Sequence, residues 1–160
     1  MVAETQFQAE IQHITDIIAV MRHKEEIYIS RDYLSDLIDC KTCKDNKVNE
    51  SFREKMGLWF YQVIEFCNFN LTTANIAMAY VDKYVGTKEG ALSLLDRREY
   101  QLSAICCFEL AVKTYEPQLL DLKILSELSH GEYSQTELQK KEREILTALR
   151  WRMCPPTAYS

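Results

Sequence analysis

Apolar residues recur at helical spacing along most of the chain, and the stretches between them are short and polar. Apolar positions at i, i+3, i+4 and i+7 lie on one face of an α-helix, whereas a half-buried strand alternates at every second position. No strand-like alternation of any length is present. The pattern therefore predicts an all-α fold. The expected helices cover residues 4–28, 51–67, 72–85, 99–115, 117–130 and 134–150.

Several boundaries of these helices carry recognisable end signals. Ser51 with Glu54, and Ser134 with Glu137, have the spacing of a capping box, in which each side chain satisfies a free N–H group of the first turn. Gly86 is expected to end the helix over residues 72–85 in the left-handed conformation that glycine adopts at low cost. The polar stretch over residues 41–50 reads as a loop.

The helix over residues 99–115 is expected to be the buried centre of the bundle. Cys106, Cys107 and Leu110 extend its apolar surface beyond one face, and a helix that is apolar on most sides is usually enclosed. Pro117 suits the first turn of the helix that follows, and His130-Gly131 is expected to close that helix.

Composition and charge narrow the class of protein. The chain has 160 residues, a net charge of −5 and a pI near 5.3, which argues against a nucleic-acid-binding protein because such proteins need a basic face. It has no apolar run long enough to cross a membrane, and its N-terminus lacks the features of a signal peptide. An intracellular protein with reduced cysteines is expected, and Cys67, Cys106 and Cys107 are expected in the core.

Candidate chemistry is sparse. Cys40 and Cys43 form a CxxC pair, which is read either as two thiols of a surface loop or as part of a zinc or redox site; zinc would need about two further ligands at suitable spacing, and none follows nearby. His13, His23 and His130 are far apart, and no nucleophile pairs with a histidine and an acid in a recognisable motif. Neither a phosphate-binding loop nor a metal or cofactor site is predicted, so we expect a binding surface and not an enzyme.

Four segments, in order along the chain, resemble motifs of the cyclin family's N-terminal box. Residues 52–59 (FREKMGLW) resemble the opening M-R-x-x-(apolar)-x-x-W helix, and residues 78–85 (MAYVDKYV) resemble N-Y-(I/L)-D-R-F-L. Residues 111–116 (AVKTYE) are similar to A-S-K-x-x-E, and residues 142–157 resemble the ending E…L…L-x-W/F…P-T. The absence of an acid before Trp59 and the Leu149-Arg150-Trp151 ending lean toward D-type cyclins.

The resemblance implies a five-helix cyclin-box bundle with a central buried helix, preceded by an N-terminal helix. Residues 1–48 would form the helical extension and loop, and residues 49–160 the cyclin box. The second cyclin fold that commonly follows is expected to be absent from these 160 residues, either because they are part of a longer cyclin or because the protein is a single-box form. Two departures stand out: residues 86–97 form a longer link than the family usually has, and Lys83 replaces the usual arginine.

As the resemblance implies, the chain would be a regulatory subunit that binds and activates a cyclin-dependent protein kinase and controls the cell cycle, in the nucleus and cytoplasm. Lys113 and Glu142 would lie together and hydrogen-bond backbone groups of the kinase. The alternative for this pair is a local ion pair between helices. The alternative for the function is a transcription-type cyclin, or another cyclin-box module without a cell-cycle role.

The resemblance also assigns two further groups of residues. Arg53 and Asp82 would form a structural ion pair between adjacent helices. Met56, Trp59 and Gln101 would belong to a groove that docks short motifs of substrates or inhibitors; alternatively, Met56 and Trp59 are core residues of an amphipathic helix. Lys55 stands where the family commonly has an apolar residue, which opposes the docking of basic motifs.

Overall fold

The computed structural model describes residues 2–38 and 46–156. Within these ranges the chain folds into helices and contains no strand, which confirms the predicted all-α class. The pair Cys40 and Cys43, and most of the loop predicted over residues 41–50, lie outside the described residues. In chain order the elements are α1 (Val2–Tyr28), α2 (Tyr33–Ile38), α3 (Glu50–Cys67), α4 (Leu71–Val85), α5 (Lys88–Ala91), the 3₁₀ helix η1 (Leu92–Leu95), α6 (Arg97–Tyr115), α7 (Leu122–Leu128) and α8 (Gln135–Ala148).

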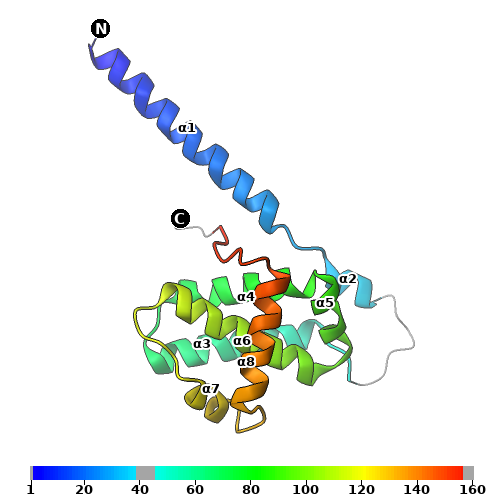
Figure 1. The fold of residues 1–160 in the computed structure, drawn as a ribbon. Coiled ribbons are helices and arrows are strands. Elements are labelled where there is room, and N and C mark those ends of the chain that lie inside the picture. Colours follow the sequence, from blue (N-terminus) through cyan, green and yellow to red (C-terminus); the bar gives the residue numbers. More distant parts are fainter. Residues whose placement is uncertain (1, 39–45, 157–160) are drawn as a thin grey trace.

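Helix α1 points away from the bundle formed by the other helices (Figure 1). Apolar side chains along it stay exposed, among them Ile11 and Ile14. Its C-terminal end is attached to α4 because Lys83 Nζ donates hydrogen bonds to the backbone carbonyls of Ile27 and Ile29. The lysine that replaces the family's usual arginine therefore joins the extension to the bundle.

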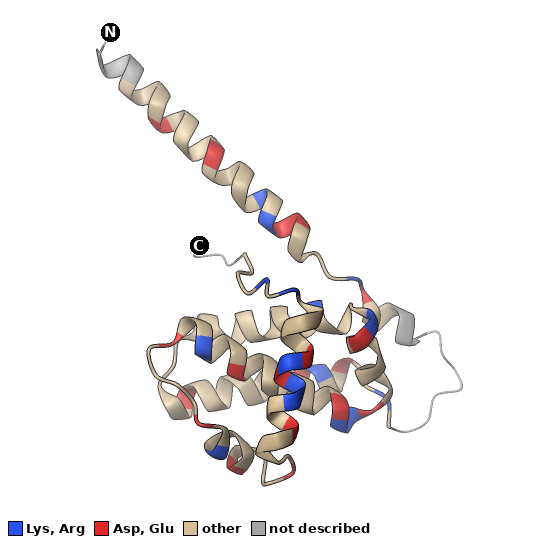
Figure 2. Cartoon of the chain, viewed as in Figure 1, with Lys and Arg blue, Asp and Glu red and all other residues tan. Residues whose placement is uncertain are grey.

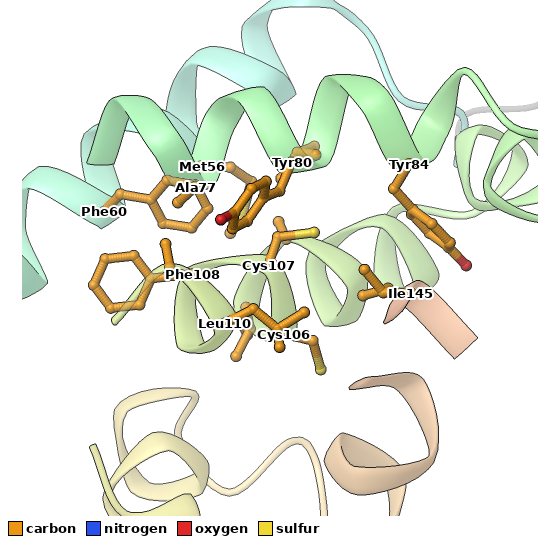
Figure 3. Close-up of a cluster of buried hydrophobic side chains, with 14 of the residues drawn as sticks. Met56, Phe60, Ala77, Tyr80, Tyr84, Cys106, Cys107, Phe108, Leu110 and Ile145 are labelled. Carbon is orange, nitrogen blue, oxygen red and sulfur yellow. The ribbon is translucent and has the colours of Figure 1, made fainter. Parts of the chain in front are cut away.

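Helix α6 forms the centre of the bundle, as its all-round apolar sequence predicted. Every residue from Leu102 to Val112 is buried, and α6 contacts α3, α4, η1 and α8. In the core, Phe108 stacks on Phe60 of α3 with the ring centroids 5.1 Å apart (Figure 3). A helix enclosed on this many sides gives the domain a rigid axis, since close-packed interiors resist deformation.

Helix α8 lies across α6 and is amphipathic. Leu138, Ile145 and Leu146 are buried, while charged residues of both signs lie along the helix (Figure 2). The predicted capping box at its start is confirmed: the Glu137 amide donates to Ser134 Oγ, and the Ser134 amide donates to Glu137 Oε2 at 2.8 Å.

The capping box predicted at Ser51 and Glu54 is wrong. Helix α3 begins at Glu50, and the Asn49 side chain is the cap that accepts a hydrogen bond from the Phe52 amide at 2.9 Å. Asparagine is at least as good a cap as serine, so the helix starts two residues earlier and Ser51 falls inside its first turn.

The left-handed ending predicted for Gly86 is also wrong, because its φ is −70° and the backbone stays right-handed. The chain turns directly into α5, whose N-cap is Thr87; the Thr87 hydroxyl accepts a hydrogen bond from the Gly90 amide. The glycine that this corner requires is Gly90, since a Cβ there would lie 2.0 Å from the carbonyl oxygen of Tyr84. The long link over residues 86–97 is thus a folded unit made of α5 and η1.

Pro117 does not begin a helix. Glu116 before it is extended, at φ −102° and ψ 145°, as expected because proline disfavours the helical conformation of the preceding residue. Helix α7 begins at Leu122, with Asp121 as its cap. The predicted closure at His130-Gly131 is close to the observed end, since both residues have positive φ just after Ser129, the C-cap of α7.

Glu137 should make the domain sensitive to acid. Hydrogen bonds from the Ser134 amide and hydroxyl, with the Arg98 ion pair, lower the pKa of Glu137 from its ordinary value of 4.5 to about 2. A carboxyl with a lowered pKa stabilises the fold above its unfolded pKa, and this stabilisation is lost as the pH falls. We expect the free energy of unfolding to fall between about pH 4.5 and 2, with a shallower fall in Glu137→Gln. Urea denaturation at a series of pH values measures the free energy of unfolding. An equal dependence of that free energy on pH in the two proteins would contradict the prediction.

Candidate functional site

Lys113 and Glu142 lie together on the surface where α6 meets α8. Lys113 is in the last turn of α6 and Glu142 is in the middle of α8, and Lys113 Nζ is 2.8 Å from Glu142 Oε1. The helices are held in register by buried contacts such as that of Cys106 Sγ with the Leu138 carbonyl. The structure thus brings together the two residues singled out from the sequence. Their role in binding a kinase stays a prediction.

A third charged residue, Glu109, joins this pair and was missed in the sequence. It lies one turn before Lys113 on α6, its side chain is 0% exposed, and its Oε1 is 2.9 Å from Lys113 Nζ. Burial opposes the charged form of Lys113, but the carboxylates of Glu109 and Glu142 outweigh it and raise the pKa of Lys113 above its ordinary value. The available signal was an acid within the mostly apolar stretch over residues 102–112, four residues before Lys113.

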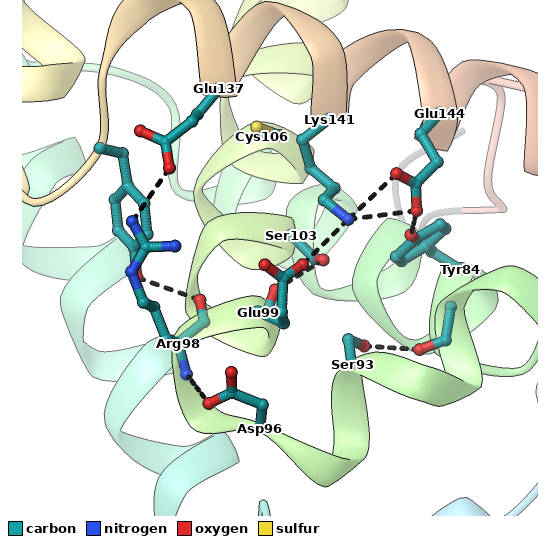
Figure 4. A network of polar contacts seen from close by, with 12 residues as sticks. Tyr84, Ser93, Asp96, Arg98, Glu99, Ser103, Cys106, Glu137, Lys141 and Glu144 are labelled. Carbon is teal, nitrogen blue, oxygen red and sulfur yellow. Dashed lines mark hydrogen bonds and ion pairs between the residues drawn. The ribbon is translucent and has the colours of Figure 1, made fainter.

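A second set of ionic contacts and hydrogen bonds joins α8 to α6 and α4 (Figure 4). Lys141 Nζ lies 3.2 Å from Glu99 Oε2 of α6 and 3.1 Å from Glu144 Oε2 of α8. The hydroxyl of Tyr84, on α4, donates to Glu144 Oε1 at 2.5 Å. These contacts link three helices, so the surface that carries Glu142 is tied to the rest of the bundle.

The segment that connects Lys113 to Glu142 exposes large apolar side chains. Tyr115, Leu119 and Ile124 are 42%, 73% and 43% exposed. Protein interfaces typically combine such apolar area with a few fixed polar groups. These three side chains supply apolar area that a partner could cover.

Arg53 and Asp82 form a two-point ion pair between α3 and α4. Arg53 Nε and Nη2 donate to the two Asp82 oxygens at 3.0 and 2.6 Å, and the hydroxyl of Tyr33 donates to Asp82 Oδ1 at 2.6 Å. The hydrogen bonds to Asp82 raise the pKa of Arg53, against the effect of burial. Tyr33, which the sequence did not single out, attaches α2 to this pair.

Glu116, part of the segment AVKTYE, has a structural role at the start of α4. Its Oε1 accepts hydrogen bonds from the Asn70 amide at 2.8 Å and from the Thr73 hydroxyl at 2.5 Å. The carboxylate thus satisfies groups around the N-terminus of α4, where an anion is favourable.

Replacing Glu116 by alanine should lower the free energy of unfolding by about 1–3 kcal/mol, because two donors lose a charged acceptor. Glu116→Gln keeps an acceptor oxygen and should cost less. Thermal unfolding gives the loss, and hydrogen exchange should locate it in the first turn of α4. An alanine variant as stable as wild type would show that these contacts contribute nothing.

The three residues assigned to a docking groove are mostly enclosed. Met56 is buried, and the partly buried ring of Trp59 packs edge-on against Phe108 with centroids 5.8 Å apart. Gln101 Oε1 accepts a hydrogen bond from the Tyr133 hydroxyl at 3.2 Å. The burial of Met56 agrees with the alternative that it is a core residue of an amphipathic helix, and the docking groove stays a prediction.

The described part of the chain gives little support to other kinds of site. Cys106 and Cys107 are buried as predicted, whereas Cys67 is only half-buried. No group of three or more His, Cys, Asp or Glu side chains is arranged to hold a metal ion among residues 2–38 and 46–156. Over the same ranges, no helix combines the length and apolar character needed to span a membrane.

Comparison with known proteins assigns the family. Residues 16–154 match the family described as "Cyclin, N-terminal domain". Relatives include G2/mitotic-specific cyclin-2 of Antirrhinum majus, 26% identical over 94% of this chain and 31% of its own length. Cyclin-D3-3 of Arabidopsis thaliana is 32% identical over 68% of this chain and 30% of its own length, and Cyclin-D3-2 of Oryza sativa subsp. japonica is 34% identical over 69% and 32%. The chain spans about a third of the length of these relatives. It belongs to the cyclin family.

Proposed function

We propose that the chain is the part of a cyclin that binds and activates a cyclin-dependent protein kinase and so regulates the cell cycle. The observation that carries the proposal is the pair Lys113 and Glu142, held 2.8 Å apart on the surface of α6 and α8. The Lys113 side chain keeps 35% of its surface exposed, and an ammonium group has three N–H donors. It can therefore donate a charge-assisted hydrogen bond to a backbone carbonyl of a partner.

The mechanism follows from the rigidity of this surface. A kinase whose regulatory helix is swung out lacks the lysine–glutamate ion pair that positions the ATP phosphates. A fixed helical surface that binds only the swung-in state shifts the equilibrium toward that state, by no more than its difference in affinity for the two. In this mechanism the chain acts as a regulatory subunit of the kinase.

Two further roles belong to the same proposal. Short motifs of substrates or inhibitors would dock near Met56, Trp59 and Gln101, through the edges of side chains that are otherwise packed. The chain would work in the nucleus and cytoplasm, where such kinases and their substrates meet.

The test is capture of purified cyclin-dependent kinases by the immobilised full chain. We expect at least one kinase to be retained after washing and to elute in a one-to-one complex. Capture of kinases that act in transcription, and none that act in division, would replace the cell-cycle role with the transcription-type alternative. No capture from a panel that covers both classes would contradict the proposal.

A further inference from the structure

Glu109 lies directly beneath the surface that carries Lys113 and Glu142, and it is unusual because it is an acid enclosed in the bundle. Its side chain is 0% exposed, and the approach of Lys113 Nζ to Oε1 lacks hydrogen-bond geometry, so neither carboxylate oxygen has a hydrogen bond. A buried charge without hydrogen bonds is costly, and native proteins seldom retain one without compensation. Lys113 is the cation that compensates it.

Lys113 is shared between two acids. Its Nζ is 2.9 Å from Glu109 on the same helix and 2.8 Å from Glu142 on α8. Glu142 keeps 17% of its side chain exposed, so it retains contact with water when Lys113 moves, whereas Glu109 does not. Removing Lys113 from this position thus has its main cost at Glu109.

We propose that Glu109 is a positioning residue that holds the Lys113 ammonium group on the free domain, and that it takes up a proton from solvent when a bound kinase draws that group away. The inference rests on the proposed function, since it requires a partner that engages Lys113. It adds a property that the pair Lys113 and Glu142 alone would not have: binding coupled to proton uptake.

The direction of the coupling follows from the surrounding groups. Burial raises the pKa of Glu109 above its ordinary value, Lys113 lowers it, and the charge of Glu142 raises it. Cys106 and Lys141 also lie near this cluster; burial raises the pKa of the Cys106 thiol, which therefore stays neutral, and Lys141 remains cationic. Withdrawing Lys113 leaves burial and Glu142 to act, so the pKa of Glu109 is higher in the complex. Affinity must then increase as the pH falls through the interval between the two pKa values, which begins above the ordinary 4.5.

The experiment measures the Kd of a captured kinase from pH 5.5 to 8.5 for the wild-type chain, Glu109→Gln and Glu54→Gln. Glutamine keeps the shape of Glu109 and removes its charge. As the pH rises from 5.5 to 8.5, we expect the Kd of the wild type to increase by a factor about ten times larger than that of Glu109→Gln. At pH 8, Glu109→Gln should bind the kinase about tenfold more tightly than the wild type does. Glu54→Gln is the control, because Glu54 is an exposed glutamate of α3 outside this cluster, and it should keep the wild-type profile.

Parallel profiles for the wild type and Glu109→Gln would overturn the inference while leaving the proposed function intact. Failure of the wild type to bind any kinase would instead remove the proposed function. A kinase-free measurement separates the two: carbon NMR of the Glu109 carboxyl should give a midpoint above 4.5 that moves higher in Lys113→Ala. An unchanged midpoint in that variant would show that Lys113 does not hold the charge of Glu109.

Discussion

Replacing Lys113 by alanine should weaken the binding of a cyclin-dependent kinase by about 30- to 1,000-fold. Truncating one partner of a buried, hydrogen-bonded charge contact costs about 2–4 kcal/mol, because the remaining groups lose their partner in a desolvated interface. Here the loss of affinity would fall on the kinase carbonyl that loses its donor. Within the domain, the same variant leaves Glu109 and Glu142 without the cation that lies 2.9 and 2.8 Å from them. Glu142→Ala should also weaken binding, and the double variant should lose less than the sum of the two.

Two charged residues outside this surface provide controls. Lys140 is exposed on the same helix as Glu142, and Glu54 is exposed on α3. Alanine at either position should leave the Kd within about twofold of wild type, since exposed charges contribute little. Calorimetry or surface plasmon resonance gives the affinities of the wild type and the five variants. If Lys113→Ala binds like the Lys140→Ala control, the pair is only a local ion pair between helices.

Asp82→Ala is expected to destabilise the fold by about 3 kcal/mol, at the lower end of the range for breaking a buried ion pair. The lower end applies because Arg53 and Asp82 side chains keep 33% and 24% of their surface exposed. The substitution leaves the Arg53 guanidinium and the Tyr33 hydroxyl without their shared acceptor. Since these groups join α2, α3 and α4, the loss should include early opening of α2.

A double-mutant cycle tests this interpretation. Arg53→Met with Asp82→Ala removes both charges and should recover part of the loss seen in Asp82→Ala, because no unpaired guanidinium remains. Urea unfolding supplies the free energies. A cost below about 0.5 kcal/mol for Asp82→Ala would mean that water replaces the ion pair without penalty.

The long helices could be predicted from sequence because their apolar periodicity is extensive. For α6 the pattern also gave the place in the bundle, since apolar residues around most of a helix have no other stable location than the centre. The start of α3 was predicted two residues late, because Ser51 has the spacing of a capping box while the observed cap is Asn49, a residue type that caps equally well. The short elements α2, α5 and η1 are too brief for periodicity to reveal.

The candidate site was only partly predictable, because its contacts join residues that are far apart in the sequence. Lys113 and Glu142 came from the resemblance to cyclins, and nothing in their local sequence places them 2.8 Å apart. Glu109 could be read as an acid on an apolar helix, but its complete burial depends on how α8 covers α6. Tyr33 and Glu116 act through contacts with distant segments, which no local pattern encodes.

The most direct test of the central claim is the activity of a purified cyclin-dependent kinase with and without the full chain. At saturating concentration the chain should increase the rate of substrate phosphorylation at least about tenfold, because a population shift of that size needs only about 1.4 kcal/mol of preference for the active state. Lys113→Ala at the same concentration should leave the kinase near its basal rate. A chain that binds the kinase and leaves its rate unchanged would contradict the account.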